Sequence, residues 1–261
     1  VTTMIWAVSA LCLISTFHGL DYKPLDHVNK VLFSGEVMPI KHLKSWMDHL
    51  PKATFVNLYG PTEITCNCTY HILDRKREYD KIPIGNNFPN EDVFLLGNHD
   101  EVVDEPLKVG EICVRSSELA LGYFNNWVET NKRFVQNPKQ KYYLDLIYRT
   151  GDLGYYNEQK ELFFSGRKDF QIKYMGHRIE LEEIERAIHN VMGIERCCVL
   201  FLEEKNRLVA FYVGQINESD VRQNLKERLP IYMLPTKWIV IPKFPLTKNG
   251  KIDRKALERM I

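Results

Sequence analysis

The sequence has few cysteines, and their spacing does not indicate a disulfide framework. Six of its 261 residues are cysteine. Cys197 and Cys198 are adjacent, and Cys66 and Cys68 are close together. Small secreted domains that depend on disulfides are much richer in cysteine. We therefore expect buried, reduced thiols and a cytoplasmic protein.

The sequence also lacks an excess of charge of either sign. It contains 35 Lys and Arg residues against 34 Asp and Glu residues, a formal net charge of +1. A dedicated nucleic-acid-binding protein carries a clear basic excess, so we expect no nucleic-acid partner. Glycine and proline number only 14 and 12, which excludes a low-complexity or disordered chain.

The apolar opening segment, residues 4–14, is too short to cross a membrane. A spanning helix needs about 20 residues, so we expect no membrane span. No basic stretch precedes the segment, which makes it a poor signal peptide. Its composition is typical of a buried strand that leads into a helix. Because the sequence starts at Val1 and not at a methionine, we expect that an upstream part is missing.

The pattern of the sequence changes twice, which predicts three parts. Residues 1–80 alternate short apolar runs with helical spacing, as expected for a mostly parallel sheet with packed helices. Residues 81–168 hold short strand-like runs between turn residues and predict a β-rich, barrel-like subdomain. Residues 169–261 predict a small α+β domain in which Ser219 caps a helix. The expected fold is therefore α/β with a β-barrel-like subdomain and a small C-terminal α+β domain.

Four polar, glycine-containing segments differ from their apolar surroundings, although each alone is compatible with an ordinary turn or a solvated linker. They are residues 57–63, 148–153, 166–180 and 245–254.

The first of these segments follows a predicted parallel strand, where α/β sheets bind their ligands. The ring of Tyr59, the hydroxyl of Thr62 and the carboxylate of Glu63 suit a nucleotide with a metal ion. In the second and fourth segments, Asp152 could accept bonds from two sugar hydroxyls, and Lys251 could reach an anion.

In this order the segments resemble those of the adenylate-forming enzymes. That superfamily includes the adenylation domains of nonribosomal peptide synthetases, D-alanine–carrier protein ligases, acyl-CoA synthetases and luciferases. The resemblance runs from about Val1 to Leu257, and LFSGEVMP with YGPTE is most similar to the D-alanine–carrier protein ligases of the amino-acid-activating branch. The motifs that carry it are NLYGPTE, GEICVRSSELALGYFNN, YRTGDL, GRKDFQIKYMGHRIELEEIE, LPIYMLP and PLTKNGKIDRKAL.

The resemblance implies ATP and Mg²⁺ as cofactors and assigns roles to individual residues. Lys251, Thr62 and Glu63 would be catalytic, with Glu63 facing the metal ion. The nucleotide would contact Asn57, Tyr59, Gly60, Asp152 and Arg167. The acyl pocket would include Ile5, Leu32, Ser34, Leu58, Cys66 and Asn67. Asp169 would be the hinge of the C-terminal domain, and Lys173 and Gly176 would lie beside the phosphopantetheine arm in the thiol step.

A metal site at Cys66, Cys68 and His71 is a competing interpretation of one cluster. We favour instead a strand whose alternation turns both thiols to one inner face.

The resemblance implies that an amino acid is activated as its adenylate and loaded onto the phosphopantetheine of an acyl or peptidyl carrier protein. The alternatives are an acyl-CoA synthetase and a non-catalytic fragment or carrier-docking module. The family's Ser/Thr/Gly-rich phosphate loop, and the acidic residue that holds the amino group, lie upstream of the region that this chain resembles. We therefore expect an adenylate-forming ligase whose 261-residue part is inactive by itself.

Overall fold

The structure, a computed structural model, describes residues 1–247 and 250–261. The chain divides into two compact units, Val1–Asp169 and Phe170–Ile261, and each is described by itself. Lys248 and Asn249, which belong to the last polar segment, lie outside the described residues.

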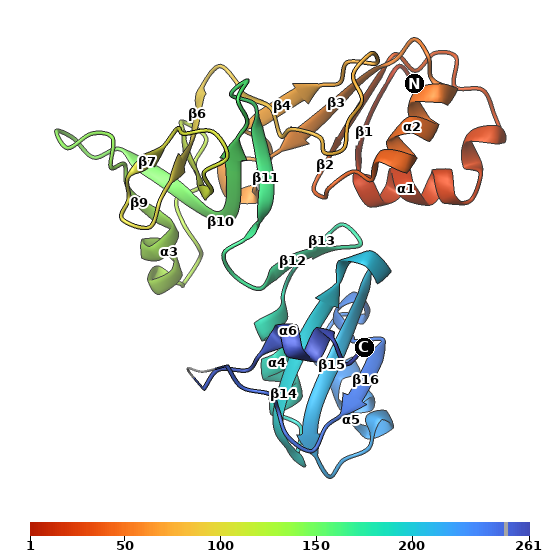
Figure 1. Cartoon of the computed structure of the whole chain (residues 1–261), viewed down its shortest axis with the longest axis vertical. Coiled ribbons are helices and arrows are strands. Elements are labelled where there is room, and N and C mark those ends of the chain that lie inside the picture. The colour runs from red at the N-terminus through yellow and green to blue at the C-terminus, as the bar shows by residue number, and fades with distance from the viewer. Residues whose placement is uncertain (248–249) are drawn as a thin grey trace. The chain divides into compact units, whose positions relative to one another are not determined.

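The first unit begins with a five-stranded sheet that packs against helices (Figure 1). Its first three strands are parallel, and the last two are antiparallel to their neighbours. Buried Trp46 joins the two helices, because its indole N–H donates to the carbonyl of Leu11 at 2.9 Å. The elements are β1 (Thr3–Ala7), α1 (Val8–Thr16), η1 (Gly19–Asp21), β2 (Lys30–Ser34), α2 (Ile40–His49), β3 (Thr54–Tyr59), η2 (Thr62–Ile64), β4 (Thr69–Ile72) and β5 (Asn86–Asn87).

A second, six-stranded sheet completes this unit, and its strands all pair antiparallel. In the described residues the end strands β11 and β7 do not pair with each other, so the barrel-like subdomain is an open sheet. The elements are β6 (Glu91–Leu96), β7 (Val102–Val103), β8 (Gly110–Ser116), α3 (Trp127–Arg133), β9 (Phe134–Gln136), β10 (Leu146–Tyr156) and β11 (Leu162–Arg167).

Residues 148–153, which alone are compatible with an ordinary turn, lie inside the long strand β10. The register of β10 against β8 shifts between Arg149 and Leu153, and Gly151 has φ +75°. Glycine tolerates this left-handed conformation, so the strand deforms locally and continues.

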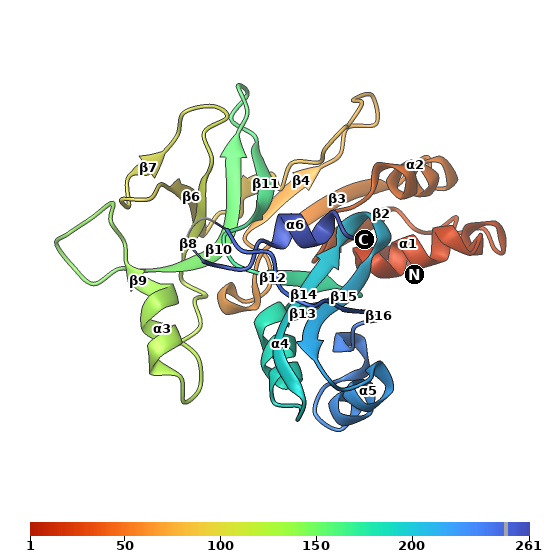
Figure 2. The same cartoon turned by 60° about the horizontal axis from the view of Figure 1, so that its bottom comes forward.

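The second unit places one small sheet between helices on both of its faces. Strand alternation divides the core: Val199 and Ala210 pack with the helices α4 and α5, whereas Leu200 and Val209 pack with Leu257 of α6. Figure 2 shows α6 lying over this sheet. The elements are β12 (Gln171–Tyr174), β13 (His177–Glu180), α4 (Leu181–His189), β14 (Ile194–Leu202), η3 (Glu203–Lys205), β15 (Arg207–Gly214), α5 (Glu218–Lys226), η4 (Ile231–Met233), β16 (Lys237–Val240) and α6 (Arg254–Glu258).

Residues 166–180, which alone are compatible with a solvated linker, contain the boundary between the two units and then the strands β12 and β13, which pair as an antiparallel hairpin. Met175 and Gly176 form its turn, and both have positive φ, as a tight two-residue hairpin turn requires. The hairpin is rich in charged residues, which hides the alternation that marks a strand.

The N-cap predicted at Ser219 is also wrong, because Asn217 caps α5. Its side-chain oxygen accepts the backbone N–H of Asp220 at 3.0 Å, while Ser219 lies inside the helix. Both residue types are good caps, so the sequence alone does not separate them.

The second unit has its own core, and we expect residues 170–261 to fold when expressed alone. Thermal unfolding followed by circular dichroism should give one cooperative transition. Replacing Leu208, which is fully buried, by alanine should cost about 2–5 kcal/mol. Replacing Met192, which is exposed, should have little effect. A non-cooperative melt of the unsubstituted unit would contradict the expectation.

Candidate active site

Tyr59 and Asp152 meet where the two sheets of the first unit approach each other. Tyr59 ends β3, and its hydroxyl donates to Oδ2 of Asp152 in β10 at 2.6 Å. Both residues are buried. Burial and then the negative charge of Asp152 raise the pKa of Tyr59 well above its usual value, so the phenol stays protonated as a donor.

Arg167 engages the same carboxylate from the neighbouring strand. Asp152 and Arg167 are partners in the β10–β11 register, and the guanidinium bonds to Oδ1 of Asp152. Arg167 also donates from Nε to Oδ1 of Asp169 at 2.6 Å. Three residues assigned to the nucleotide, and the expected hinge, therefore belong to one connected cluster.

Gly60 allows the chain after β3 to turn tightly. A Cβ at this position would lie 2.5 Å from Cα of Asn67 and 2.6 Å from the carbonyl oxygen of Cys66. Real atoms do not approach so closely, so only glycine fits. The following turn places Thr62 at the surface and Glu63 in the interior.

The buried carboxylate of Glu63 is held by a tyrosine that sequence reasoning missed. The hydroxyl of Tyr123 donates to Oε1 of Glu63 at 2.5 Å, and it lies 3.1 Å from the hydroxyl of Tyr148 in β10. Burial and then the bond to Glu63 raise the pKa of Tyr123, which keeps it protonated. Tyr123 lies within a motif of the resemblance, GEICVRSSELALGYFNN, which was the available signal.

The backbone reinforces this arrangement. The N–H of Ala120 donates to the carbonyl of Glu63 at 2.8 Å, and the hydroxyl of Thr65 donates to the carbonyl of Glu118 at 2.8 Å. The loop that carries Tyr123 is therefore bound along the turn that carries Glu63.

A single buried carboxylate is a reasonable donor set for Mg²⁺ together with a phosphate-bearing substrate. Mg²⁺ is commonly held by one or two carboxylates, with water and substrate phosphates completing its shell. No group of three or more His, Cys, Asp or Glu residues suited to a metal ion occurs in the part of the chain that the structure describes.

Asn57 lies in β3 beside this cluster, but its side chain contacts the protein. Its amide donates to the carbonyl of Pro83 at 2.8 Å. Asn57 thus fixes the segment that leads to β5.

The residues expected to form the acyl pocket differ widely in exposure. Leu58 is buried, Leu32, Ser34 and Asn67 are half-buried, and Ile5 and Cys66 are exposed. Oδ1 of Asn67 is buried and has no hydrogen-bond partner among the described residues.

The strand proposed for Cys66 and Cys68 is wrong. Both residues precede β4, and Cys66 is exposed with φ +96° while Cys68 is buried. The left-handed backbone at Cys66 breaks the alternation, so the two thiols do not share one inner face.

The other predicted residues belong to the second unit. Lys251 is exposed, and its carbonyl accepts the N–H of Thr247 at 2.7 Å in a short turn. Lys173 lies in β12, and Gly176 in the turn of the hairpin.

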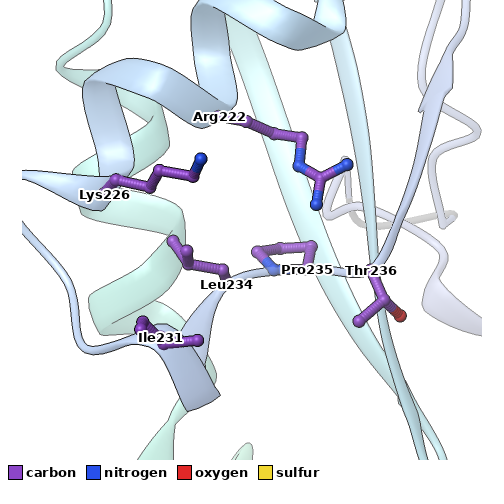
Figure 3. A pocket seen from close by; sticks show the side chains of 6 residues that line it. All are labelled: Arg222, Lys226, Ile231, Leu234, Pro235 and Thr236. Carbon is purple, nitrogen blue, oxygen red and sulfur yellow. The ribbon is translucent and has the colours of Figure 1, made fainter.

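The second unit also has a shallow hollow at α5. Figure 3 shows Arg222 and Lys226 on one side, facing Ile231, Leu234 and Pro235. None of the predicted site residues lines it.

In the described residues no helix is long and apolar enough to span a bilayer.

Comparison with known proteins decides the family. A sequence profile of the AMP-binding enzymes matches residues 1–124, and one of the AMP-binding enzyme C-terminal domain matches residues 183–251. Together they cover more than half of the chain. This chain belongs to the AMP-binding enzyme family.

The relatives of this chain include large synthases and a ligase. It is 34% identical to tyrocidine synthase 3 of Brevibacillus parabrevis, across 98% of this chain and 4% of that protein. It is 33% identical to the D-alanine–D-alanyl carrier protein ligase of Bacillus licheniformis, across 96% of this chain and 51% of that one. The chain thus spans about half of the ligase and a small part of the synthase.

Solved structures confirm the adenylate-forming fold. The holo form of PA1221, a protein of adenylation and PCP domains, is 31% identical with a TM-score of 0.83, across 99% of this chain and 44% of that chain. The Vibrio cholerae adenylation domain AlmE, in complex with glycyl-adenosine-5′-phosphate, is 25% identical with a TM-score of 0.86, across 100% of this chain and 49% of that chain.

Replacing Tyr123 by phenylalanine should destabilise the fold, because the buried carboxylate of Glu63 loses a donor. A hydrogen bond to a charged group contributes about 1.5–3 kcal/mol, and urea unfolding should show a loss of that size. The matched control is Tyr156→Phe, since the hydroxyl of Tyr156 has no hydrogen-bond partner among the described residues. Equal losses in both variants would contradict the assigned contact.

Proposed function

We propose that this chain supplies the nucleotide and carboxylate chemistry of a ligase that activates an amino acid with ATP and loads it onto the phosphopantetheine of a carrier protein. The observation that carries the proposal is the cluster of Tyr59, Asp152 and Arg167. Two of the compared proteins support amino-acid activation and carrier loading, since one is named a D-alanine–D-alanyl carrier protein ligase and another was solved in complex with glycyl-adenosine-5′-phosphate.

Asp152 would bind the ribose of the nucleotide. Each of its oxygens already accepts a bond, from Tyr59 and from Arg167, which fixes the carboxylate in place. An ionised carboxylate has about four acceptor sites, so capacity remains for the two ribose hydroxyls. Tyr59 would pack against the adenine, with Asn57 and Gly60 shaping the segment around it.

Thr62 and Glu63 would serve the phosphates. The exposed hydroxyl of Thr62 would donate to a phosphate oxygen, and Glu63 would hold Mg²⁺. The ion would neutralise phosphate charge while the carboxylate approaches.

Lys251 would bring together the two anions of the first step. A carboxylate oxygen of the amino acid attacks the α-phosphorus of ATP, and the bond to pyrophosphate breaks. A cation 4 Å from an anion contributes about 4 kcal/mol of favourable interaction energy at an effective dielectric near 20, which offsets the repulsion between the two anions. Because this charge acts as the reaction proceeds, its loss should lower the rate.

The second step would use the β12–β13 hairpin of the C-terminal unit after rotation about Asp169. The thiol sulfur attacks the acyl carbon, the bond to AMP breaks, and the thiol proton passes to solvent. Lys173 and Gly176 lie at the hairpin that would then border the phosphopantetheine arm. Gly176 has no side chain to obstruct that arm.

One residue of the expected pocket has an acceptor available for the amino acid. The unpartnered Oδ1 of Asn67 would accept a hydrogen bond from it. Ile5, Leu32, Ser34, Leu58 and Cys66 would contact the rest of the substrate.

Lys251→Ala should separate the two half-reactions in the natural polypeptide that contains this chain. The unsubstituted protein should catalyse amino-acid-dependent exchange of pyrophosphate into ATP. The variant should lose about a hundredfold or more of that exchange, the scale expected for removing a preorganised charge partner. Thioester formation from a preformed aminoacyl-adenylate should change much less.

Lys255→Ala is the matched control, because Lys255 is an exposed lysine in the same C-terminal segment. It should leave both half-reactions unchanged. Absence of exchange with every amino acid, in a folded unsubstituted protein, would overturn the proposed activity. Equal losses in both half-reactions of Lys251→Ala would overturn only the role of Lys251.

A further inference from the structure

Asp169, at the end of the first unit, lies between two arginines. Arg167 donates to it from Nε at 2.6 Å and from Nη2 at 2.8 Å. Arg133 donates from Nη2 to Oδ2 of Asp169 at 3.0 Å. Arg133 lies 36 residues before Asp169 in the sequence, so only the fold brings the two together.

Arg133 is itself fixed at the end of α3. Its Nε donates to Oε1 of Glu129, one helical turn earlier, at 3.0 Å. The neighbouring Lys132 also pairs with Glu129, at 3.0 Å, but the structure gives it no contact with Asp169. Arg133 and Lys132 therefore both pair with Glu129, but only Arg133 also pairs with Asp169.

Gly151 of β10 leaves the space in which this cluster sits. A Cβ there would lie 2.7 Å from Nη1 of Arg133, 2.8 Å from Nη2 of Arg167 and 3.0 Å from Oδ2 of Asp169. The carbonyl of Gly151 also accepts the N–H of Lys168 at 2.8 Å. The irregular part of β10 thus binds both the side chains and the backbone of the segment that ends at Asp169.

We propose that Arg133 is a positioning residue that restrains Asp169 at the boundary between the two units. Arg167 connects this restraint to Asp152, so the boundary is linked to the nucleotide site. The link to catalysis rests on the proposed function, whereas the restraint does not.

The ion pair between Arg133 and Asp169 is weak enough to break during a conformational change. Arg133 and Asp169 are 21% and 30% exposed in their side chains, so water can replace the ion pair. Partly exposed pairs contribute little to stability and can open locally without unfolding the core. A reaction in two steps, with one reorientation between them, requires a boundary that is held but can be released.

Limited digestion with trypsin tests the restraint in this chain as it stands. Cleavage after Arg167 and Lys168, detected by mass spectrometry, reports local opening at the boundary. We expect cleavage to be severalfold faster in Arg133→Gln than in the unsubstituted chain. Lys132→Gln, the matched control, should leave the rate unchanged.

A double substitution separates the restraint from general destabilisation. If Arg133 acts through Asp169, Asp169→Asn should accelerate cleavage by itself, and adding Arg133→Gln should accelerate it no further. Additive effects, or equal rates in Arg133→Gln and Lys132→Gln, would overturn the restraint. Because the charge of Asp169 directly after Lys168 itself slows trypsin, each rate is divided by that of the same bonds in the unfolded chain. Where Arg133→Gln fails to fold, an unchanged ratio in Asp169→Asn overturns the proposal.

The link to catalysis has its own readout in the natural polypeptide. Arg133→Gln should change the ratio of thioester formation to pyrophosphate exchange severalfold, and Lys132→Gln should not. An unchanged ratio, with exchange still present in the unsubstituted protein, would overturn the link and leave the proposed function intact.

Discussion

The carboxylate of Asp152 is the contact on which the arrangement of the first unit depends. It receives the hydroxyl of Tyr59 from the parallel sheet and the guanidinium of Arg167 from the antiparallel sheet. A buried carboxylate is tolerated only when it is paired and hydrogen-bonded. The need to satisfy this one charge therefore fixes the end of β3 against the middle of β10, which is also where a nucleotide would bind.

The same requirement extends outward in two directions. Arg167 also bonds to Asp169, which ends the first unit, and Asp169 in turn pairs with Arg133. Tyr148 lies in the same strand as Asp152. Its hydroxyl contacts the hydroxyl of Tyr123, which donates to the buried carboxylate of Glu63. The residues proposed for ribose and hinge are thus parts of one polar network, and the residue proposed for the metal ion belongs to a second network held by the same strand.

The sequence was informative where a pattern is local and uninformative where contacts are distant. The alternation of short apolar runs with helical spacing predicted within residues 1–80 is confirmed by β2, α2 and β3. The motifs identified the family and the polar segments, but periodicity did not reveal that 148–153 continues a strand or that 166–180 contains a hairpin. Tyr123 and Arg133 could not be found by spacing, because their partners Glu63 and Asp169 are brought to them only by the fold.

The most direct test of the account is whether Asp152 recognises ribose hydroxyls. Calorimetry on the natural polypeptide would compare AMP with 2′,3′-dideoxy-AMP, in the unsubstituted protein and in Asp152→Asn. Hydrogen bonds to a charged acceptor contribute about 1.5–3 kcal/mol, so AMP should bind at least about tenfold more tightly than the dideoxy compound. The variant should lose most of that difference. Equal affinity for the two nucleotides in the unsubstituted protein would contradict the account.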